Sequence, residues 1–447
     1  MNVGTQRFLL LGASKSGLSA GKYILSKGAK CYVYEERKNF RTDNALKELS
    51  SLGAVIVDKN NPDGAIADSD VVVISPGVPI NHDVAVKAKN DKKRIIGELE
   101  FGYLSLLPTT VAVTGTNGKT TTVSMIEHIL KNCEKDVFAV GNIGVPITEK
   151  LGEIHSDSVV VAEVSSFQLE SVYSFCPHIA CVLNVSPDHL ERHYTMDNYV
   201  FLKKRIFSRQ RESEYTVLNY DDEMVRGFAS ETRGKVVFVS IKEKQDGAYK
   251  SGNGLYYKDD LIITTDELPV KGEHNEYNAL FSIACAKLLG VPDERIAEGL
   301  RTFKGVKHRI EFVGNVRGVN YYNDSKSTNT ASAVTALSVM NGPTVLILGG
   351  SEKGENYTAL FEKIKNSGVR HVVLMGASRF NMLSCATKTG FSDLSLTPDF
   401  CNAVKMASVI ARDGDNVLLS PACASFDCFS GFEERGERFT QIVGELN

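Results

Sequence analysis

The stretch AVTGTNGKTTT at Ala112–Thr122 decides the fold of this chain. A short apolar strand pattern precedes it, and a helical pattern from Ser124 to Leu130 follows it. A glycine-rich turn between a strand and a helix presents backbone N–H groups at the positive end of the helix, where phosphate binds. Lys119 can reach β- and γ-phosphate oxygens, and the Thr120 hydroxyl can hold Mg²⁺. The stretch therefore predicts a site for the triphosphate of ATP or GTP.

The generic phosphate-loop pattern places a glycine six residues before the lysine, where this chain has Val113. The alternative interpretation is an ordinary turn between a strand and a helix with an exposed lysine. The flanking strand and helix patterns favour the nucleotide site.

The composition excludes several classes of protein. A chain of 447 residues is too long for one hydrophobic core and suggests about three domains. The net charge of −3 provides no basic surface for nucleic acid. The nine cysteines form no C-x-x-C pair, which fits reduced thiols. Because no apolar run approaches the roughly 20 residues that span a bilayer, we expect a globular cytoplasmic enzyme with no membrane or nucleic-acid partner.

The first segment has the pattern of a nucleotide-binding βαβ unit. The apolar run Phe8–Leu11 leads into a glycine turn at 12–17, and the strand pattern Lys30–Tyr34 ends in acidic residues. An acidic residue about 20 positions after such glycines is typical of dinucleotide-binding domains. Ser14 replaces the second glycine of G-x-G-x-x-G, which weakens NAD as a ligand and leaves phosphate or a nucleotide sugar.

The rest of the chain repeats the alternation of strands and helices. A mostly parallel sheet around the phosphate loop is predicted from strand patterns at 111–113, 158–164 and 180–185. A second doubly wound domain is predicted from strand patterns at 344–348, 371–375 and 416–419. We therefore expect an α/β chain of three domains, Rossmann-like at 1–97, P-loop ATPase-like at 98–303 and Rossmann-like at 304–447.

Two side chains near the predicted sheet of the central domain are candidates for metal ligands. Glu163 lies at the end of an apolar strand pattern, where a carboxylate suits Mg²⁺, and the alternative is a helix-capping acid. His189 follows the next strand pattern and could bind a second divalent cation. His189 and His193 have the spacing of a zinc-binding helix, but Leu190 stands where that pattern needs Glu, so we expect His193 to be structural.

Lys203 lies on the apolar face of a predicted helix at 199–207, four residues after Tyr199 and four before Phe207. A buried lysine must lose its charge, find a partner or be modified. The sequence alone favours a lysine whose stem is buried and whose ammonium group reaches solvent.

Three polar blocks at 274–278, 308–309 and 323–329 could contact a nucleotide base or ribose. Their candidate side chains are Asn275, Arg309 and Asp324. Taken alone, each block is more typical of a turn.

Together these blocks resemble the Mur ligases, the ATP-dependent amide ligases of peptidoglycan synthesis. The resemblance covers nearly the whole chain, through the motifs GASKSG at 12–17, TGTNGKTT at 114–121, GNIG at 141–144, EVSSFQLE at 163–170, NVSPDH at 184–189, HNEYN at 274–278, NDSKSTN at 323–329 and LSPACASFD at 419–427. The last motif, with Phe429 and Phe432 after it, points to the members that add D-glutamate. The D-N-P-R signature of the members that add diaminopimelate or lysine is absent.

The resemblance implies a role for each matching residue. The UDP-linked substrate would contact Ser14, Glu35, Arg37, Ser75, Gly77, Asn142, Ser165 and Gln168. ATP would contact Gly115, Thr116, Asn117, Gly118, Lys119, Thr120, Thr121, Asn275, Asn278, Arg309, Asp324 and Lys326. D-glutamate would contact Thr328, Lys353, Ser425 and Phe432. Two Mg²⁺ ions would be held by Thr120, Glu163, His189 and Lys203, the last carrying a CO₂-derived carbamate, and the catalytic residues would be Lys119, Glu163, His189 and Lys203.

The implied reaction joins D-glutamate to UDP-N-acetylmuramoyl-L-alanine through an acyl phosphate, with ATP consumed, in a monomeric cytoplasmic enzyme. The rival assignments are another Mur-type ligase, folylpolyglutamate synthase, a regulatory P-loop NTPase and a dehydrogenase. Folylpolyglutamate synthase lacks a Rossmann-like domain before the phosphate loop. An NTPase switch would not need the third domain, and Ser14 disfavours the dehydrogenase.

Overall fold

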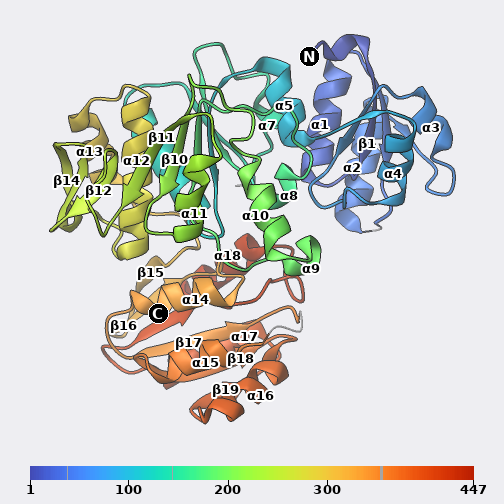
Figure 1. Cartoon of the computed structure of the whole chain (residues 1–447). Coiled ribbons are helices and arrows are strands. Elements are labelled where there is room, and N and C mark those ends of the chain that lie inside the picture. Colours follow the sequence, from blue (N-terminus) through green and yellow to red (C-terminus); the bar gives the residue numbers. More distant parts are fainter. Residues whose placement is uncertain (38, 143, 353–355, 447) are drawn as a thin grey trace. The chain divides into compact units, whose positions relative to one another are not determined.

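The computed structural model describes residues 1–37, 39–142, 144–352 and 356–446, which form three mainly parallel sheets with helices packed against them (Figure 1). The chain divides into two compact units. One comprises Met1–Pro269 and Asn275–Phe303, and the other comprises Val270–His274 and Lys304–Asn447. The predicted α/β class with three sheets is confirmed.

The first sheet has five parallel strands in the order β3-β2-β1-β4-β5. Its strands are β1 Arg7–Leu11, β2 Lys30–Tyr34, β3 Val55–Ile56, β4 Val71–Ile74 and β5 Arg94–Gly97. Its helices are η1 Val3–Thr5, α1 Lys15–Ser26, α2 Phe40–Ser51, α3 Asp63–Asp68 and α4 Asp83–Asn90. Alternate residues of β1 enter different cores, Phe8 and Leu10 with α1 and α2, and Leu9 and Leu11 with α3 and α4. The sheet is therefore covered on both faces.

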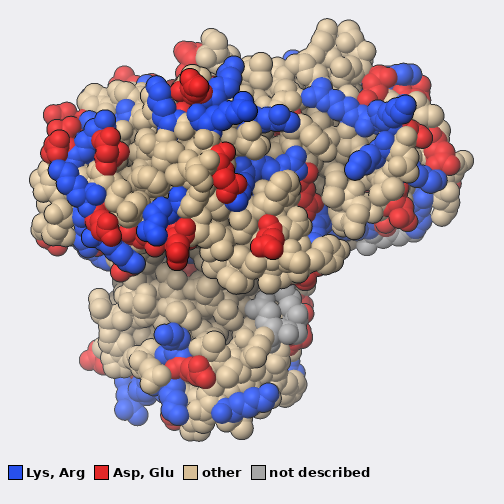
Figure 2. Space-filling view, viewed as in Figure 1, with Lys and Arg blue, Asp and Glu red and all other residues tan. Residues whose placement is uncertain are grey.

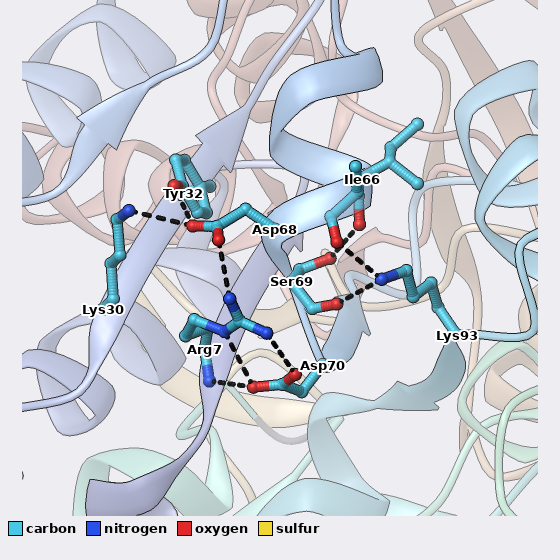
Figure 3. Close-up of polar contacts among 9 residues, drawn as sticks. Arg7, Lys30, Tyr32, Ile66, Asp68, Ser69, Asp70 and Lys93 are labelled. Carbon is cyan, nitrogen blue, oxygen red and sulfur yellow. Dashed lines mark hydrogen bonds and ion pairs between the residues drawn. The ribbon is translucent and has the colours of Figure 1, made fainter.

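A network of ion pairs closes the amino edge of the first sheet (Figure 3). The Arg7 guanidinium donates to Asp70 at 2.8 and 3.1 Å and to Asp68 at 2.6 Å. Asp68 also accepts from Lys30 Nζ at 2.8 Å and from the Tyr32 hydroxyl at 2.5 Å. These pairs join β1, β2 and the start of β4 at the edge opposite the glycine turn. Because they are exposed to solvent, they fix the register more than they add stability.

The second sheet has nine strands in the order β14-β13-β12-β11-β10-β9-β6-β8-β7, antiparallel only where β13 pairs with β12 and β14. Its strands are β6 Thr109–Thr114, β7 Val137–Gly141, β8 Val159–Glu163, β9 Ile179–Val182, β10 Tyr215–Asn219, β11 Lys235–Ser240, β12 Ala248–Ser251, β13 Gly254–Tyr257 and β14 Asp260–Thr264. The helices of this part of the chain are α5 Glu98–Leu106, α6 Lys119–Lys131, α7 Ile147–Lys150, α8 Ser166–Leu169, α9 Leu190–His193, α10 Met196–Lys204, α11 Glu223–Gly227, η2 Phe228–Ser230, η3 Thr265–Glu267, α12 Glu273–Leu288 and α13 Asp293–Thr302.

The third sheet has six strands in the order β15-β16-β20-β17-β18-β19, and only the β15–β16 pair is antiparallel. Its strands are β15 Glu311–Val316, β16 Val319–Asn323, β17 Thr344–Gly349, β18 Val369–Met375, β19 Leu394–Leu396 and β20 Asn416–Leu419. Its helices are α14 Thr330–Ser338, α15 Thr358–Lys365, α16 Arg379–Thr389, α17 Phe400–Ile410 and α18 Phe432–Gly444. Two separate cores, one with α14–α16 and one with α17 and α18, show that this sheet is also doubly wound.

Two predicted strands are shorter than expected. The pattern at 158–164 corresponds to β8 Val159–Glu163, which is one residue shorter at each end. The pattern at 180–185 predicted a strand up to Val185, but β9 ends at Val182. The Asn184 backbone carbonyl instead accepts from Thr116 N at 3.0 Å. The chain therefore leaves the sheet there to support the turn after β6.

Acidic and basic side chains are interspersed on the face shown in Figure 2, as the small net charge predicts. All nine cysteines are free, as expected. Among the described residues, the helices are too short or too polar to cross a membrane.

A buried carboxylate joins the first and second sheets. Glu98, at the start of α5, is 1% exposed, and its Oε1 accepts from Thr148 N at 2.8 Å and Thr148 Oγ1 at 2.7 Å. Thr148 Oγ1 lies 2.8 Å from Ser19 Oγ of α1. Glu98 Oε2 is buried with no hydrogen-bond partner among the described residues. Burial raises the pKa of Glu98 from 4.5 to about 7, so the neutral acid is favoured.

This raised pKa predicts a pH-dependent stability. Between about pH 4.5 and 7 the folded chain holds a proton on Glu98 that the unfolded chain releases, so the free energy of unfolding falls as pH rises. The slope from this group is at most about 1.4 kcal/mol per pH unit. Glu98→Gln should remove that slope in denaturant titrations across this range, because the amide keeps Oε1 and carries no charge. The exposed Glu153→Gln is the control, and an equal slope in the wild type and Glu98→Gln would contradict the assignment.

Candidate active site

The phosphate loop, Gly115–Gly118, joins β6 to α6 with a backbone that requires glycine at two positions. Gly115 has φ +155° and Gly118 has φ +86°. A Cβ atom on Gly118 would also lie 2.8 Å from Asn278 Oδ1. The loop therefore forms the glycine-dependent turn between a strand and the amino end of a helix that the sequence predicted.

Asn184 holds this loop in place and was not among the candidate residues from the sequence. Its Oδ1 accepts from Asn117 N at 2.9 Å, and its Nδ2 donates to Asn117 O at 3.1 Å. In the sequence, Asn184 follows an apolar run and begins the NVSPDH motif, but neither feature indicates its contact with the phosphate loop. The contact arises because β9 and β6 are neighbours in the sheet, so the segments that follow them lie side by side.

The predicted ATP residues of the first unit lie around the start of α6. Lys119 Nζ donates to Gly115 O and Thr116 O, both at 2.8 Å, so the lysine is held over the loop. Thr120 is buried, and Thr121 Oγ1 is buried with no hydrogen-bond partner among the described residues.

Asn278 and Asn275 lie beside the same helix. Asn278 Oδ1 accepts from Thr122 Oγ1 at 3.1 Å, and Asn278 Nδ2 donates to Asn275 Oδ1 at 3.1 Å. The structure thus brings the HNEYN motif next to the phosphate loop although more than 150 residues separate them in sequence.

Glu163 has the environment of a cation ligand. It ends β8, pairs with Val113 of β6 and is 2% exposed. Its Oε1 accepts from Asn142 Nδ2 at 2.8 Å, whereas its Oε2 is buried with no hydrogen-bond partner in the described part of the chain. A buried carboxylate oxygen without a partner is costly unless a cation or donor pairs with it. The residues present therefore fit a divalent cation beside the phosphate loop.

Lys203 is buried in α10 and is 1% exposed, so its ammonium group does not reach solvent, contrary to what the sequence alone favoured. Its Nζ lies 4.6 Å from the centroid of the Tyr199 ring, and no carboxylate of the described residues forms an ion pair with it. Burial lowers its pKa well below the ordinary value, the charge on Lys119 lowers it further, and Asp188 opposes the shift. The uncharged amine is therefore favoured.

Tyr199 connects this lysine to the phosphate loop. Its hydroxyl lies 3.2 Å from Thr116 Oγ1, and its ring stacks on His193 at a centroid distance of 5.4 Å. His193 is 1% exposed and bonds to Ser166 Oγ at 2.9 Å. This agrees with the expectation that His193 is structural.

His189 lies between acidic side chains, with its Nδ1 3.5 Å from Glu191 Oε1. It caps the start of α9 with φ +55° and is partly exposed, with Nε2 3.6 Å from Asp188 Oδ2. In the described ranges, no three His, Cys, Asp or Glu side chains are grouped as a metal site. Mg²⁺ usually binds through one or two protein carboxylates together with substrate phosphates, so such a preformed group is not required for it.

A second set of predicted residues meets at the carboxyl edge of the first sheet. Glu35 accepts from Ala13 N at 2.7 Å and from Arg37 N at 2.8 Å, so its carboxylate shapes the glycine turn. Ser75 Oγ donates to Gly12 O at 3.0 Å, and Arg37 Nη2 donates to Gly77 O at 3.0 Å. Ser14 caps α1 without a side-chain capping bond. These contacts bring together the loops after β1, β2 and β4.

The remaining residues assigned to the UDP-linked substrate lie at the edge of β7 and β8. Asn142 is bonded to Glu163, and Ser165 and Gln168 form a capping box at the start of α8. Ile143 of the GNIG motif lies outside the described residues. Arg192, which sequence reasoning missed, donates to Val78 O at 3.3 Å and so joins the loop after β4 to the region of His189.

The second unit contains the other predicted nucleotide residues. Asp324 is fully buried, and accepts from Ser420 Oγ at 2.7 Å and from Ile310 N at 3.2 Å. Burial raises the pKa of Asp324 to about 6, although Arg309 opposes the shift. Arg309 Nε is buried with no hydrogen-bond partner among the described residues. Lys326 Nζ lies 4.7 Å from the centroid of the Phe432 ring.

Three of the four predicted D-glutamate residues can be placed in this unit. Thr328 is half-buried on the loop after β16, Ser425 is 2% exposed on the loop after β20, and Phe432 begins α18. Phe432 O accepts from Ser325 Oγ at 2.8 Å, which joins the start of α18 to the loop after β16. Lys353 lies outside the described residues.

Comparison with known proteins agrees with the family resemblance found in the sequence motifs. Three family models match in order: the Mur ligase MurD-like N-terminal domain at 6–97, the Mur ligase middle domain at 113–286, and the Mur ligase glutamate ligase domain at 308–423. The UDP-N-acetylmuramoylalanine--D-glutamate ligase of Clostridioides difficile (strain 630) is 40% identical, covering 100% of both chains. The enzyme of the same name from Caldanaerobacter subterraneus subsp. tengcongensis is 38% identical, again over 100% of both chains.

Solved structures share the fold at lower identity. UDP-N-acetylmuramate-alanine ligase MurC of Thermotoga maritima has a TM-score of 0.64 and 19% identity, covering 99% of this chain and 100% of its own. MurF ligase of Thermotoga maritima, solved in complex with ADP, has a TM-score of 0.63 and 17% identity over 100% of both chains. With full-length relatives at 40% identity and all three domain models in order, the chain belongs to the Mur ligase family.

Proposed function

We propose that this chain is the ATP-dependent ligase that joins D-glutamate to UDP-N-acetylmuramoyl-L-alanine, with release of ADP and phosphate, in the synthesis of peptidoglycan precursors. The observation that carries the proposal is one constellation in the first unit. The phosphate loop follows β6, and Glu163, whose Oε2 has no hydrogen-bond partner among the described residues, ends the neighbouring strand β8. The buried Lys203 lies over Tyr199, whose hydroxyl contacts Thr116 of the loop. The full-length relatives named for this reaction support the choice of substrates.

Each sheet has its own role in this proposal. Residues 1–97 hold the UDP part through the loops after β1, β2 and β4. Residues 98–303 bind ATP at the phosphate loop. Residues 304–447 bind D-glutamate through the loops that carry Thr328, Ser425 and Phe432, together with Lys353. We propose that the enzyme acts in the cytoplasm as a monomer.

The reaction needs activation of a carboxylate, which is a poor electrophile. A carboxylate oxygen of UDP-N-acetylmuramoyl-L-alanine attacks the γ-phosphorus of ATP, and the bond to the bridging oxygen of ADP breaks. The product is an acyl phosphate. The neutral amine of D-glutamate then attacks its carbonyl carbon, phosphate leaves with one oxygen of the original carboxylate, and the amine loses a proton. Lys119 stabilises the negative charge that develops on the transferring phosphoryl oxygens.

Thr120, Glu163, His189 and a carbamate on Lys203 would hold Mg²⁺, at two sites. When bound, Mg²⁺ supplies positive charge to the phosphate oxygens during transfer. The low pKa of Lys203 leaves its amine free to react with CO₂, which only the neutral form does. The product is an anion whose oxygens suit a hard cation.

One assay tests the proposal against its rivals. ADP release should require both UDP-N-acetylmuramoyl-L-alanine and D-glutamate. ADP release with neither acceptor would indicate a simple NTPase. Release with a folate and glutamate, or with another amino acid in place of D-glutamate, would assign the chain to a different ligase.

The D-glutamate subsite makes a separate prediction. Ser425→Ala removes a buried hydroxyl from the loop after β20 and should raise KM for D-glutamate about tenfold, the equivalent of one charge-assisted hydrogen bond. Lys353→Ala should raise KM for D-glutamate further, because a carboxylate of the substrate would lose its cationic partner. Steady-state kinetics with each substrate varied provide the measurement. An equal rise in KM for ATP would show that these residues serve the nucleotide instead.

A further inference from the structure

Arg435 is the largest fully buried side chain of the second unit and has no role in the site assigned so far. It lies in the first turns of α18 and is 1% exposed. Burying a guanidinium is costly unless its N–H groups are satisfied. The partners that offset this cost therefore indicate what the side chain does.

The partners of Arg435 belong to two loops at the carboxyl edge of the third sheet. Arg435 Nε donates to Ser325 Oγ at 2.9 Å, and Nη2 donates to Ser325 O at 2.7 Å. On the other loop, Nη2 donates to Cys423 O at 3.1 Å, and Nη1 donates to Ala424 O at 3.4 Å. One planar group thus joins the loop after β16 to the loop after β20.

Both of these loops carry predicted ligand residues. Ser325 lies between Asp324 and Lys326 and three residues before Thr328, and Ala424 directly precedes Ser425. Ser325 Oγ, which accepts from Arg435, itself donates to Phe432 O at 2.8 Å. The guanidinium therefore controls the spacing of the segments that hold Thr328, Ser425 and Phe432.

The charge of Arg435 is not neutralised by a direct ion pair. Its four hydrogen bonds go to three carbonyls and a hydroxyl, and no carboxylate of the described residues lies within 4.0 Å of it. Burial lowers its pKa to about 10, while Asp427 and Asp324 act from further away to raise it. The group therefore stays positive at neutral pH, beneath loops expected to bind a dicarboxylate.

We propose that Arg435 is a positioning residue for the D-glutamate subsite, which fixes the two loops and places a positive charge without a direct ion pair beside the loop that carries Ser425. The inference rests on the proposed function. The planar guanidinium makes four hydrogen bonds here, and a lysine could make fewer. A lysine at this position would therefore keep the positive charge but lose the bridge between the loops.

Two variants and a matched control test the proposal. Arg435→Lys keeps the charge and loses the bridge, whereas Arg435→Gln loses both. Arg438, one turn further along α18, has a 37% exposed side chain and a long ion pair of 3.8 Å to Glu445, so Arg438→Lys and Arg438→Gln are the controls. Each protein is assayed with each of the three substrates varied, and its unfolding temperature is measured.

We expect KM for D-glutamate to rise about tenfold in Arg435→Lys and more in Arg435→Gln, as charged hydrogen bonds are lost. KM for the UDP substrate should change less than about twofold, and the Arg438 variants should resemble the wild type. Equal changes in all three KM values, or an unchanged KM for D-glutamate in a folded variant, would overturn the proposal.

Ser325→Ala keeps the measurement decisive if the Arg435 variants do not fold. It removes only the hydroxyl between Arg435 Nε and Phe432 O and should raise KM for D-glutamate selectively. An unchanged KM in this folded variant would also count against the proposal. Absence of D-glutamate-dependent ADP release in the wild type would instead contradict the proposed function itself.

Discussion

Lys119→Ala should lower kcat about 100- to 1000-fold, the usual effect of removing one donor aimed at developing transition-state charge. Lys119 is held over the phosphate loop by Gly115 O and Thr116 O, so its ammonium is already at the phosphate end of α6. The UDP substrate should still bind, because its predicted contacts lie at the edges of the first sheet and of β7 and β8.

The measurement pairs steady-state ADP release with binding of the UDP substrate by calorimetry. Lys131→Ala is the matched control, since Lys131 lies in the last turn of the same helix and only pairs with Glu127 at 2.7 Å. It should retain normal turnover. Turnover near that of the wild type in Lys119→Ala would contradict the role of the phosphate loop.

Lys203→Ala should be nearly inactive, with a loss of kcat on the order of 1000-fold, because the variant lacks the carbamate that would help to hold Mg²⁺. Burial and the charge on Lys119 favour the neutral amine of the unmodified lysine, which is a poor partner for a metal ion here, whereas a carbamate supplies an anion suited to Mg²⁺. Short carboxylic acids added to the variant should restore part of the activity. Removal of CO₂ and bicarbonate should lower the activity of the wild type.

Lys204 is the neighbouring control. It pairs with Glu231 at 2.5 Å and is partly exposed, so Lys204→Ala should keep nearly full activity. Mass spectrometry under native conditions should detect the CO₂ adduct on the wild type and not on Lys203→Ala. Full activity of Lys203→Ala, or activity of the wild type that does not depend on CO₂, would contradict the carbamate.

The strands could be predicted from sequence because parallel strands buried on both faces are continuous apolar runs. Lys30–Tyr34 and Asn416–Leu419 have the predicted limits. The strand at 180–185 was overextended because Leu183 and Val185 are apolar and buried although β9 ends at Val182. Leu183 N still donates to Thr114 O at 3.0 Å, but Val185 N donates to the Asp222 carboxylate at 3.0 Å. Hydrophobicity reports burial, and it does not report which backbone groups pair.

The site was predictable where a single segment contains the signal. Apolar residues four positions away on either side placed Lys203 on the apolar face of a helix, although full burial of its ammonium group was not expected from them, and the glycines indicated the phosphate loop. Contacts between distant segments could not be read from spacing. Asn184 on the phosphate loop and Arg435 between the loops of the second unit depend on which strands become neighbours in the sheet.

Glu35 shows a different limit of sequence reasoning. Its position after β2 predicted a contact with the nucleotide part of the substrate. In the structure both carboxylate oxygens accept backbone N–H groups, from Ala13 and Arg37. Its contact with the substrate stays a prediction, whereas its effect on the shape of the glycine turn is clear.

The central claim is that ATP activates the carboxylate of UDP-N-acetylmuramoyl-L-alanine for attack by D-glutamate. The most direct test incubates the wild-type enzyme with ATP, D-glutamate and UDP-N-acetylmuramoyl-L-alanine labelled with ¹⁸O in its carboxylate, and analyses both products by mass spectrometry. The account predicts a UDP product extended by one glutamyl residue and one ¹⁸O atom in each inorganic phosphate released. Phosphate without the label, or no glutamyl product while ADP accumulates, would contradict it.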